Sequence, residues 1–371
     1  MALFLLILLV ALALLYVNLN TLAGGRAGQA IALAVLVFLF VSMAFRDTLP
    51  GSVAVAFFAV WLPNSLLLYI PWTLYRAGYR FAQPHHLSRR FVRCVSRWLL
   101  ALSLLVVAVM FAYGVPHNGD YKTVYLTVGL PSQYTQDFTA IFFSDIHMDP
   151  LFRAEKLERF IAQADSVKPD YLLFGGDLAD VSMPQLDAWG YDSLFKKLAA
   201  TATVAAVAVN GNHESMQERA GSNPDEWMRK AGFVVLDDST ACIDRACFTG
   251  RTDFQVARAR GVERRPLSEM LPPDSLRPWI LLDHQPKGIE NGHTGRLPDF
   301  ALSGHTHDGQ FFPVTFLIDY FWKVAYGRGA LGGVLWLVSS GFDCWGPPVR
   351  FGSDSEIWII RFKATAETGR D

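Results

Sequence analysis

Acidic residues and lysine are almost missing from the first third of this 371-residue sequence. Residues 1–118 contain eight arginines, no lysine and one acid, Asp47, a charge of +7, whereas the other 253 residues carry 25 basic and 33 acidic side chains, a charge of −8. The acidic second part excludes a basic nucleic-acid surface, so no nucleic-acid polymer is expected as a partner. Only 18% of residues are charged and 51% are hydrophobic, which places part of the chain in lipid.

Cysteine is also scarce, with four in the whole chain, which excludes a disulfide-dense secreted scaffold. Cys242 and Cys247 flank Ile-Asp-Arg-Ala between two short apolar runs, a spacing that a β-hairpin can bridge. An extracytoplasmic location would permit a disulfide between them, and two free thiols are the alternative. Cys94 and Cys344 are expected to be unpaired.

Long apolar runs dominate residues 1–118. A spanning helix needs about 20 apolar residues, and four runs approach that length: 2–19, 27–45, 53–75 and 98–115. A signal peptide is the alternative for the first run, but that run has no cationic start and three more follow. We therefore predict a membrane anchor of about four helices. No Asp, Glu or Lys lies within the runs, which disfavours a transporter or channel.

The connection 76–97 contains six arginines and no acid. The positive-inside rule places this connection in the cytoplasm, so the domain 119–371 is expected on the extracytoplasmic side of the cell membrane, the inner membrane of a bacterium. Arg89, Arg93 and Arg97 recur at four-residue spacing and could also hold anionic headgroups. The simpler interpretation is that they only set the orientation.

From Phe138 onward, short apolar runs alternate with helical stretches, which predicts an α/β fold with largely parallel strands. The expected strands are 138–144, 171–174, 204–209, 233–236, 279–282 and 300–303, and the expected helices are 154–165, 185–199 and 224–231.

Five of the strand ends are followed by residues that bind metal ions. In chain order they are Asp145 and His147; Asp177 and Asp180; Asn212, His213 and Glu214; Asp283 and His284; and His305 and His307. Functional groups in α/β folds collect beyond the carboxyl ends of strands, so these side chains are expected at one edge of a sheet. A lone histidine is usually a hydrogen-bonded residue rather than a ligand, but five such ends in order predict a metal site.

In this order the motifs resemble those of the calcineurin-like metallophosphoesterases: Asp-x-His at 145–147, Gly-Asp-x-x-Asp at 176–180, Gly-Asn-His-Glu at 211–214, His284, and Gly-His-x-His at 304–307. The likeness covers roughly residues 138–362 and is greater to a membrane-anchored bacterial branch, through Gly-His-Thr-His-Asp-Gly-Gln at 304–310 and Trp-Gly-Pro-Pro-Val-Arg at 345–350. Asp308 replaces the usual glycine. The resemblance implies a sandwich of two β-sheets flanked by helices.

The resemblance also implies two divalent metal ions, Mn²⁺ in the first place and Fe or Zn²⁺ as alternatives. One ion would be held by Asp145, His147, Asp177 and His307, and the other by Asp177, Asn212, His284 and His305. A hydroxide that bridges the ions would attack the phosphoester. His213 corresponds to the general acid, and Asp180 is the second candidate catalytic residue, in an orienting role that Glu214 shares.

Membrane attachment favours a phosphodiester or pyrophosphate substrate linked to an envelope lipid, and soluble extracytoplasmic nucleotides or phosphoesters are the alternative. The aromatic stretch 311–322 follows the last ligand motif, so Phe311 and Phe312 are candidate substrate contacts in a lid that touches the bilayer. Plain core packing is the other interpretation. Arg350 could bind a phosphate or sugar, or form a structural ion pair. A non-catalytic scaffold or sensor is disfavoured because every expected ligand type is present.

Overall fold

The computed structural model describes residues 2–23, 25–82 and 87–364. It divides the chain into two compact units. We call Met1–Pro116 with Gly346–Val349 the helical unit, and His117–Trp345 with Arg350–Asp371 the sheet unit.

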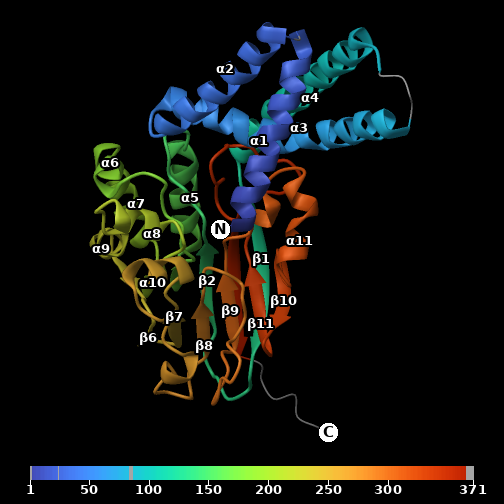
Figure 1. Cartoon of the computed structure of the whole chain (residues 1–371). Helices are drawn as coiled ribbons and strands as arrows, with labels where there is room; N and C mark the ends of the chain where they lie inside the picture. The colour runs from blue at the N-terminus through green and yellow to red at the C-terminus, as the bar shows by residue number, and fades with distance from the viewer. Residues whose placement is uncertain (1, 24, 83–86, 365–371) are drawn as a thin grey trace. The chain divides into compact units, whose positions relative to one another are not determined.

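The helical unit contains four helices (Figure 1): α1 (Ala2–Ala23), α2 (Gly25–Ala44), α3 (Leu49–Ala82) and α4 (Arg89–Asn118), of which the last two residues are assigned to the sheet unit. By length and composition, α2, α3 and α4 can each cross a membrane. In α1 the side chains before Leu9 lie outside the described residues, and the apolar stretch Leu9–Ala23 is shorter than a span. The first predicted span, 2–19, therefore lies partly outside the described residues.

The arginine-rich connection is more helical than expected. Arg76 and Arg80 lie on α3, and the other four arginines lie on α4, so only a short segment of the expected loop 76–97 separates the two helices. Arginine is a good helix former, which lets both helices continue beyond their apolar runs. Within the unit, Trp61 Nε1 donates to Ser103 Oγ at 2.9 Å and joins α3 to α4.

The sheet unit is built on two six-stranded sheets. In spatial order, the first sheet comprises β1 (Lys122–Leu130), β12 (Glu356–Ala364), β2 (Phe138–Phe143), β3 (Tyr171–Phe174), β4 (Ala205–Ala208) and β5 (Phe233–Val235). The second comprises β10 (Gly327–Leu331), β11 (Val334–Val338), β9 (Phe300–Ser303), β8 (Trp279–Leu282), β7 (Ala246–Gly250) and β6 (Ser239–Ile243). Only β1, β10, β11 and β12 fall outside the runs from which we expected strands or hairpins.

Strand pairing is largely parallel, as predicted, with antiparallel pairs only at β12–β2, β10–β11 and β6–β7 among the described strands. The central strands are short and apolar throughout; all four residues of β3, β8 and β9 are buried. Parallel strands of this composition need cover on both faces. One core cluster contains residues of both sheets, including Phe142, Leu173, Phe248 and Leu302, so the sheets pack as a sandwich.

Helices cover the outer face of the first sheet. They are α5 (Ala154–Val167), α6 (Met183–Ala188), α7 (Tyr191–Ala199), α8 (Glu214–Arg219) and α9 (Pro224–Lys230), with α10 (Phe254–Arg260) after them in the chain (Figure 1). Phe160 of α5 and Phe195 of α7 pack into a second core cluster with strands β2 to β5. Three 3₁₀ turns, Leu267–Glu269, His307–Gly309 and Val314–Phe316, and the short α11 (Ile318–Phe321) complete the unit.

One predicted helix, 185–199, is broken. Gly190 has a φ of 79°, in the left-handed region that glycine adopts readily, and it separates α6 from α7. The turn redirects the chain, and both shorter helices still bury apolar side chains, Leu186 and Phe195, in the same cluster.

Candidate metal centre

The five predicted strand ends meet in the sheet unit. Asp145 follows β2, Asp177 follows β3, Asn212 follows β4, His284 follows β8 and His305 follows β9. Hydrogen bonds join these ends: Asp145 N donates to Gly176 O at 2.9 Å in the first sheet, and Gly304 N donates to His284 O at 3.1 Å in the second. Between the sheets, His305 N donates to Asp145 Oδ1 at 3.0 Å. The ends of both sheets therefore form one edge, as the βα pattern requires.

The first group of candidate ligands is Asp145, His147 and His307, all buried. His147 Nε2 lies 3.2 Å from His307 Nε2, and Asp145 Oδ1 lies 3.4 Å from His307 Nε2. Two imidazole nitrogens that face each other beside a carboxylate oxygen form the donor set of a cation site.

The second group is Asp177, His284 and His305, and a third, made of His147, Asp177 and His213, overlaps both. Asp177 Oδ2 lies 3.1 Å from His284 Nε2 and 3.5 Å from His147 Nε2 of the first group. One carboxylate oxygen is thus shared between the two groups. His284 Nδ1 is fixed by the carbonyl of Gly175 at 2.8 Å, which leaves Nε2 as the nitrogen directed at Asp177.

The polar atoms of this centre test whether a metal ion fits. Asn212 Oδ1 is buried without a hydrogen-bond partner, and His284 Nε2 has only the Asp177 carboxylate oxygen at 3.1 Å. A buried polar atom without a partner is costly in water-free surroundings, and a bound cation would satisfy both. Burial, followed by the charge of His284, lowers the pKa of His305 to about 3, so its imidazole is in the neutral form that binds metal. The residues therefore fit two cations.

Five of the seven expected ligands have positive backbone φ angles: Asp145 (55°), His147 (47°), Asp177 (60°), His305 (74°) and His307 (52°). Non-glycine residues rarely adopt this left-handed conformation, and strain of this kind is concentrated at functional sites. Asp308 also adopts it, with φ 50°, so it keeps the turn that the usual glycine would make. A Cβ at Gly211 would overlap the Asp177 carboxylate, which explains why glycine precedes Asn212.

His213 and Asp180 form a pair beside the ligands. His213 Nδ1 lies 2.6 Å from Asp180 Oδ1, and His147 Nδ1 lies 3.1 Å from the same oxygen. Burial disfavours charge on His213, but Asp180 and Asp177 outweigh it and raise its pKa to about 9. Burial likewise opposes charge on Asp180, and the two histidines nevertheless hold its pKa below the usual range. His213 is therefore protonated at neutral pH.

Glu214 does not point at the ligand groups. Its carboxylate accepts from Leu178 N and from Gly211 N, each at 2.7 Å, and so ties the loop after β3 to the loop after β4. Burial, followed by the charge of Asp177, raises its pKa to about 7. Glu214 therefore orients the loops that carry Asp177 and Asn212.

For Arg350 the sequence left a phosphate or sugar contact and a structural ion pair open. It is 0% exposed, and its guanidinium donates to the carbonyls of His307 (2.8 Å), Ser340 (2.6 Å) and Asp343 (2.8 Å). These contacts favour a structural role, although through carbonyls, since no ion pair of Arg350 occurs among the described residues. A buried guanidinium with five donors can satisfy several carbonyls at once, and here it fixes the ligand loop at His307.

The aromatic stretch divides into buried and exposed side chains. Phe311 is buried, and its backbone pairs with Phe351, which favours the packing interpretation for this residue. Phe312 is partly buried and packs edge-on against Phe316 at 5.7 Å between ring centroids. The exposed aromatic side chains come later: Phe316 (72%), Tyr320 (86%) and Phe321 (75%).

Sequence reasoning missed a sixth loop at this edge. Residues 339–343 follow β11, and Phe342 N donates to Ser144 O at 2.7 Å while Asp343 N donates to Asp145 O at 2.9 Å. The sequence signal for this loop is the apolar run 334–338, which directly precedes Ser-Ser-Gly-Phe-Asp. Nor did the sequence suggest a role for Ser144, whose hydroxyl donates to Asp145 Oδ2 at 2.5 Å.

Comparison with known proteins agrees with this geometry. The profile of the calcineurin-like phosphoesterase family matches residues 138–309. An "uncharacterized metallophosphoesterase" of Aquifex aeolicus is 30% identical over 226 residues, which cover 59% of this chain and 83% of that protein. One of Helicobacter pylori is 28% identical over 229 residues, 61% of this chain and 60% of that protein.

A vertebrate relative includes the membrane part in its name. The zebrafish (Danio rerio) "transmembrane protein with metallophosphoesterase domain" is 27% identical over 285 residues, 71% of this chain and 62% of that protein. The matched region thus spans about 60% of the length of the Helicobacter and zebrafish relatives.

Proposed function

We propose that this chain, which belongs to the calcineurin-like metallophosphoesterase family, hydrolyses phosphodiester or pyrophosphate bonds with two divalent cations. The members of that family are metal-dependent phosphoester hydrolases. The observation that carries the proposal is Asp177 Oδ2, which stands between His284 Nε2 and His147 Nε2 and so joins two buried ligand groups through one oxygen. When bound, the two cations would withdraw charge from the phosphoryl group and activate water. They would also offset the acidic charge of the domain.

The protein side chains divide the remaining work. Because Nδ1 of His213 is engaged by Asp180, Nε2 is the nitrogen left to protonate the departing oxygen. Asp180 keeps that imidazole charged and oriented. Glu214 holds the two loops that position Asp177 and Asn212. Arg350 holds the loop of His307 from behind.

A lipid-linked substrate is the class that we favour. Three helices suited to a membrane precede the domain in the chain, so the domain is tethered near a lipid surface. Phe316, Tyr320 and Phe321 expose their aromatic rings within 15 residues of the ligand His307. Aromatic side chains prefer the membrane interface, so these three could contact the bilayer while a lipid headgroup enters the centre.

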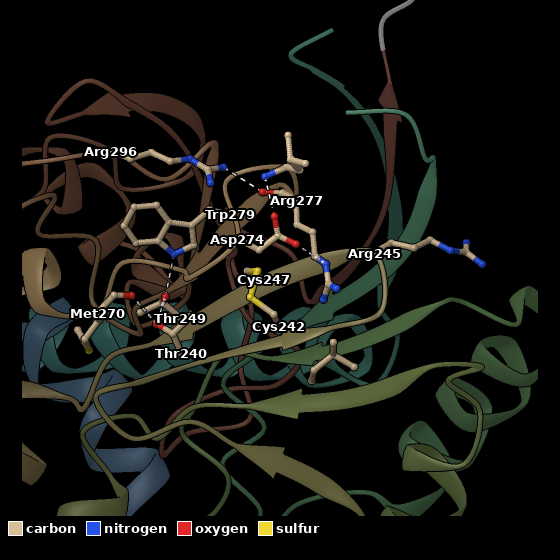
Figure 2. The surroundings of a disulfide bond; sticks show 12 residues. Thr240, Cys242, Arg245, Cys247, Thr249, Met270, Asp274, Arg277, Trp279 and Arg296 are labelled. Carbon is tan, nitrogen blue, oxygen red and sulfur yellow. Dashed lines mark hydrogen bonds and ion pairs between the residues drawn. A yellow bond between two sulfur atoms is a disulfide. The ribbon is translucent and has the colours of Figure 1, made fainter. Parts of the chain in front are cut away.

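An extracytoplasmic location agrees with the cysteines. Cys242 of β6 and Cys247 of β7 form a disulfide across the hairpin, as Figure 2 shows. Disulfides persist in oxidising compartments and are rare in the cytosol. Together with the six arginines in the last part of α3 and the first part of α4, the disulfide supports placing the domain outside the cytoplasm.

The experiment is a substrate screen of the purified full chain with Mn²⁺, using lipid phosphodiesters, lipid pyrophosphates and nucleotide diesters. Asp177→Asn is expected to lower kcat/KM by more than about a hundredfold, the loss typical even of residues that only support a metal ligand. Asp192→Asn on α7 is the matched control and should retain activity. Equal activity of wild type and Asp177→Asn would contradict the mechanism, and preference for nucleotide diesters would favour the soluble-substrate alternative.

A further inference from the structure

Phe254, Arg264 and Lys287 form a cationic aromatic cluster. The Arg264 guanidinium carbon and the Lys287 ammonium nitrogen each lie over the Phe254 ring, 3.9 Å from its centroid. Phe254 begins α10 and is 39% exposed, and Lys287 is exposed as well. An aromatic face at an exposed site attracts a cation by only about 0.5–1 kcal/mol. Because this attraction is small, two cations on one ring are unusual in an acidic domain.

The cluster is attached to two of the loops that carry metal ligands. Asp253, which caps α10, donates its backbone N–H to Asn210 Oδ1 at 2.9 Å and accepts from Gln285 Nε2 at 2.7 Å. Asn210 is two residues before Asn212, and Gln285 follows His284 directly. Phe254 therefore stands where the loop of Asn212 meets the loop of His284.

The two cations differ in what neutralises them. Arg264 Nη2 is paired with Asp283 Oδ2 at 2.8 Å, and both side chains are almost fully buried. Lys287 is exposed, and in the described part of the chain its ammonium group makes no ion pair or side-chain hydrogen bond; the Asp253 and Asp283 carboxylates act on its charge only from a longer distance. Arg264 is thus a structural cation, whereas Lys287 is held over the ring with all three ammonium donors available.

We propose that Lys287, positioned by Phe254, binds a second anionic group of the substrate next to the scissile phosphoester. The inference rests on the proposed function and narrows its substrate class to pyrophosphate diesters or phosphoesters that carry a neighbouring phosphate or carboxylate. A lysine ammonium suits such a group because it acts as a mobile point charge with several donors. The ions would hold the phosphoryl group that reacts, and Lys287 would hold its neighbour.

The test compares two soluble substrates on the full chain with Mn²⁺. ADP-ribose has a second charged phosphoryl group beside the bond that breaks, and bis(p-nitrophenyl) phosphate has none. Lys287→Met is expected to raise KM for ADP-ribose about tenfold to a hundredfold, the usual effect of losing one charge-assisted hydrogen bond. It should change kcat/KM for bis(p-nitrophenyl) phosphate less than about twofold, and Lys287→Arg should restore most of the loss. Lys197→Met, an exposed lysine on α7, controls for the change in net charge.

Each outcome decides the matter. A selective rise in KM for ADP-ribose, smaller in Phe254→Leu, supports the subsite. An equal effect on both substrates, or none on either, overturns it while the proposed function stands. If wild type hydrolyses neither these substrates nor the lipid esters, the proposed function itself fails and the subsite falls with it.

Discussion

At the scale of single residues, the chemistry depends on charge states that neighbouring residues impose. His213 is buried, a position that by itself favours the neutral imidazole, yet Asp180 at 2.6 Å keeps it protonated and raises its pKa to about 9. A histidine that must donate a proton at neutral pH needs such a partner.

Asp180→Asn removes the carboxylate that stabilises the imidazolium, so the pKa of His213 should fall. Activity that requires protonated His213 is lost as pH rises through that pKa, and the alkaline limb of the kcat/KM profile should therefore move about 1–2 pH units lower. The profile is measured with an alkyl phosphodiester, whose leaving oxygen needs a proton. An unchanged limb in Asp180→Asn would show that this pair does not set the acid.

Much of the site was predictable at this scale, and the exceptions have physical reasons. Residues of the kinds that bind metal ions follow the apolar runs of the sequence. They indicated which side chains would converge, because parallel strands place their carboxyl ends together. Metal binding by them stays a prediction. The sequence could not decide between the two roles of Arg350, because its partners are backbone carbonyls at His307 and Ser340, 33 residues apart in the chain, which no motif reveals. Lys287 has its role only through Phe254, which precedes it by more than 30 residues.

At the scale of elements, the α/β alternation predicted the central strands, and the family resemblance supplied the two-sheet sandwich. Strands β1 and β12 were not predicted. They pair in parallel along nine residues at the edge of the first sheet, although 225 or more residues separate their sequences. Such pairing is decided by tertiary packing rather than local pattern. The aromatic stretch likewise could be recognised from sequence, but only the fold shows that Phe311 is buried and Phe316 exposed.

The exposed aromatic segment carries the next prediction. Replacing Phe316, Tyr320 and Phe321 together by Ser removes most of its interfacial affinity, since each ring contributes about 1.5–3 kcal/mol when buried. Hydrolysis of a lipid phosphodiester in vesicles should fall about tenfold or more, and hydrolysis of bis(p-nitrophenyl) phosphate should stay within about twofold. Tyr125→Ser, an exposed tyrosine on β1, is the control. Equal losses on both substrates would show that the segment serves packing rather than membrane contact.

At the scale of the whole molecule, the charge division of the sequence coincides with two structural units. Six of the eight arginines among residues 1–118 lie in the last part of α3 and the first part of α4, and the carboxylates of the centre, Asp145 and Asp177, belong to the acidic sheet unit. We therefore interpret the arginines as an orientation signal, and we interpret part of the acidic excess as ligands for cations.

Orientation is tested by an alkaline phosphatase reporter fused after His117 in place of the sheet unit. The reporter folds only where its disulfides form, so it should be active if α4 runs outward. A fusion after Phe81, at the end of α3, should be inactive. The opposite pattern would place the domain in the cytoplasm.

The most direct measurement is the metal content of the purified full chain by mass spectrometry, after dialysis against Mn²⁺ and removal of unbound ions. Two buried ligand groups that share Asp177 Oδ2 predict two ions per chain in the wild type, two in Asp192→Asn, and fewer than one in Asp177→Asn. One ion or none in the wild type, or an unchanged content in Asp177→Asn, would contradict a dinuclear centre built on Asp177.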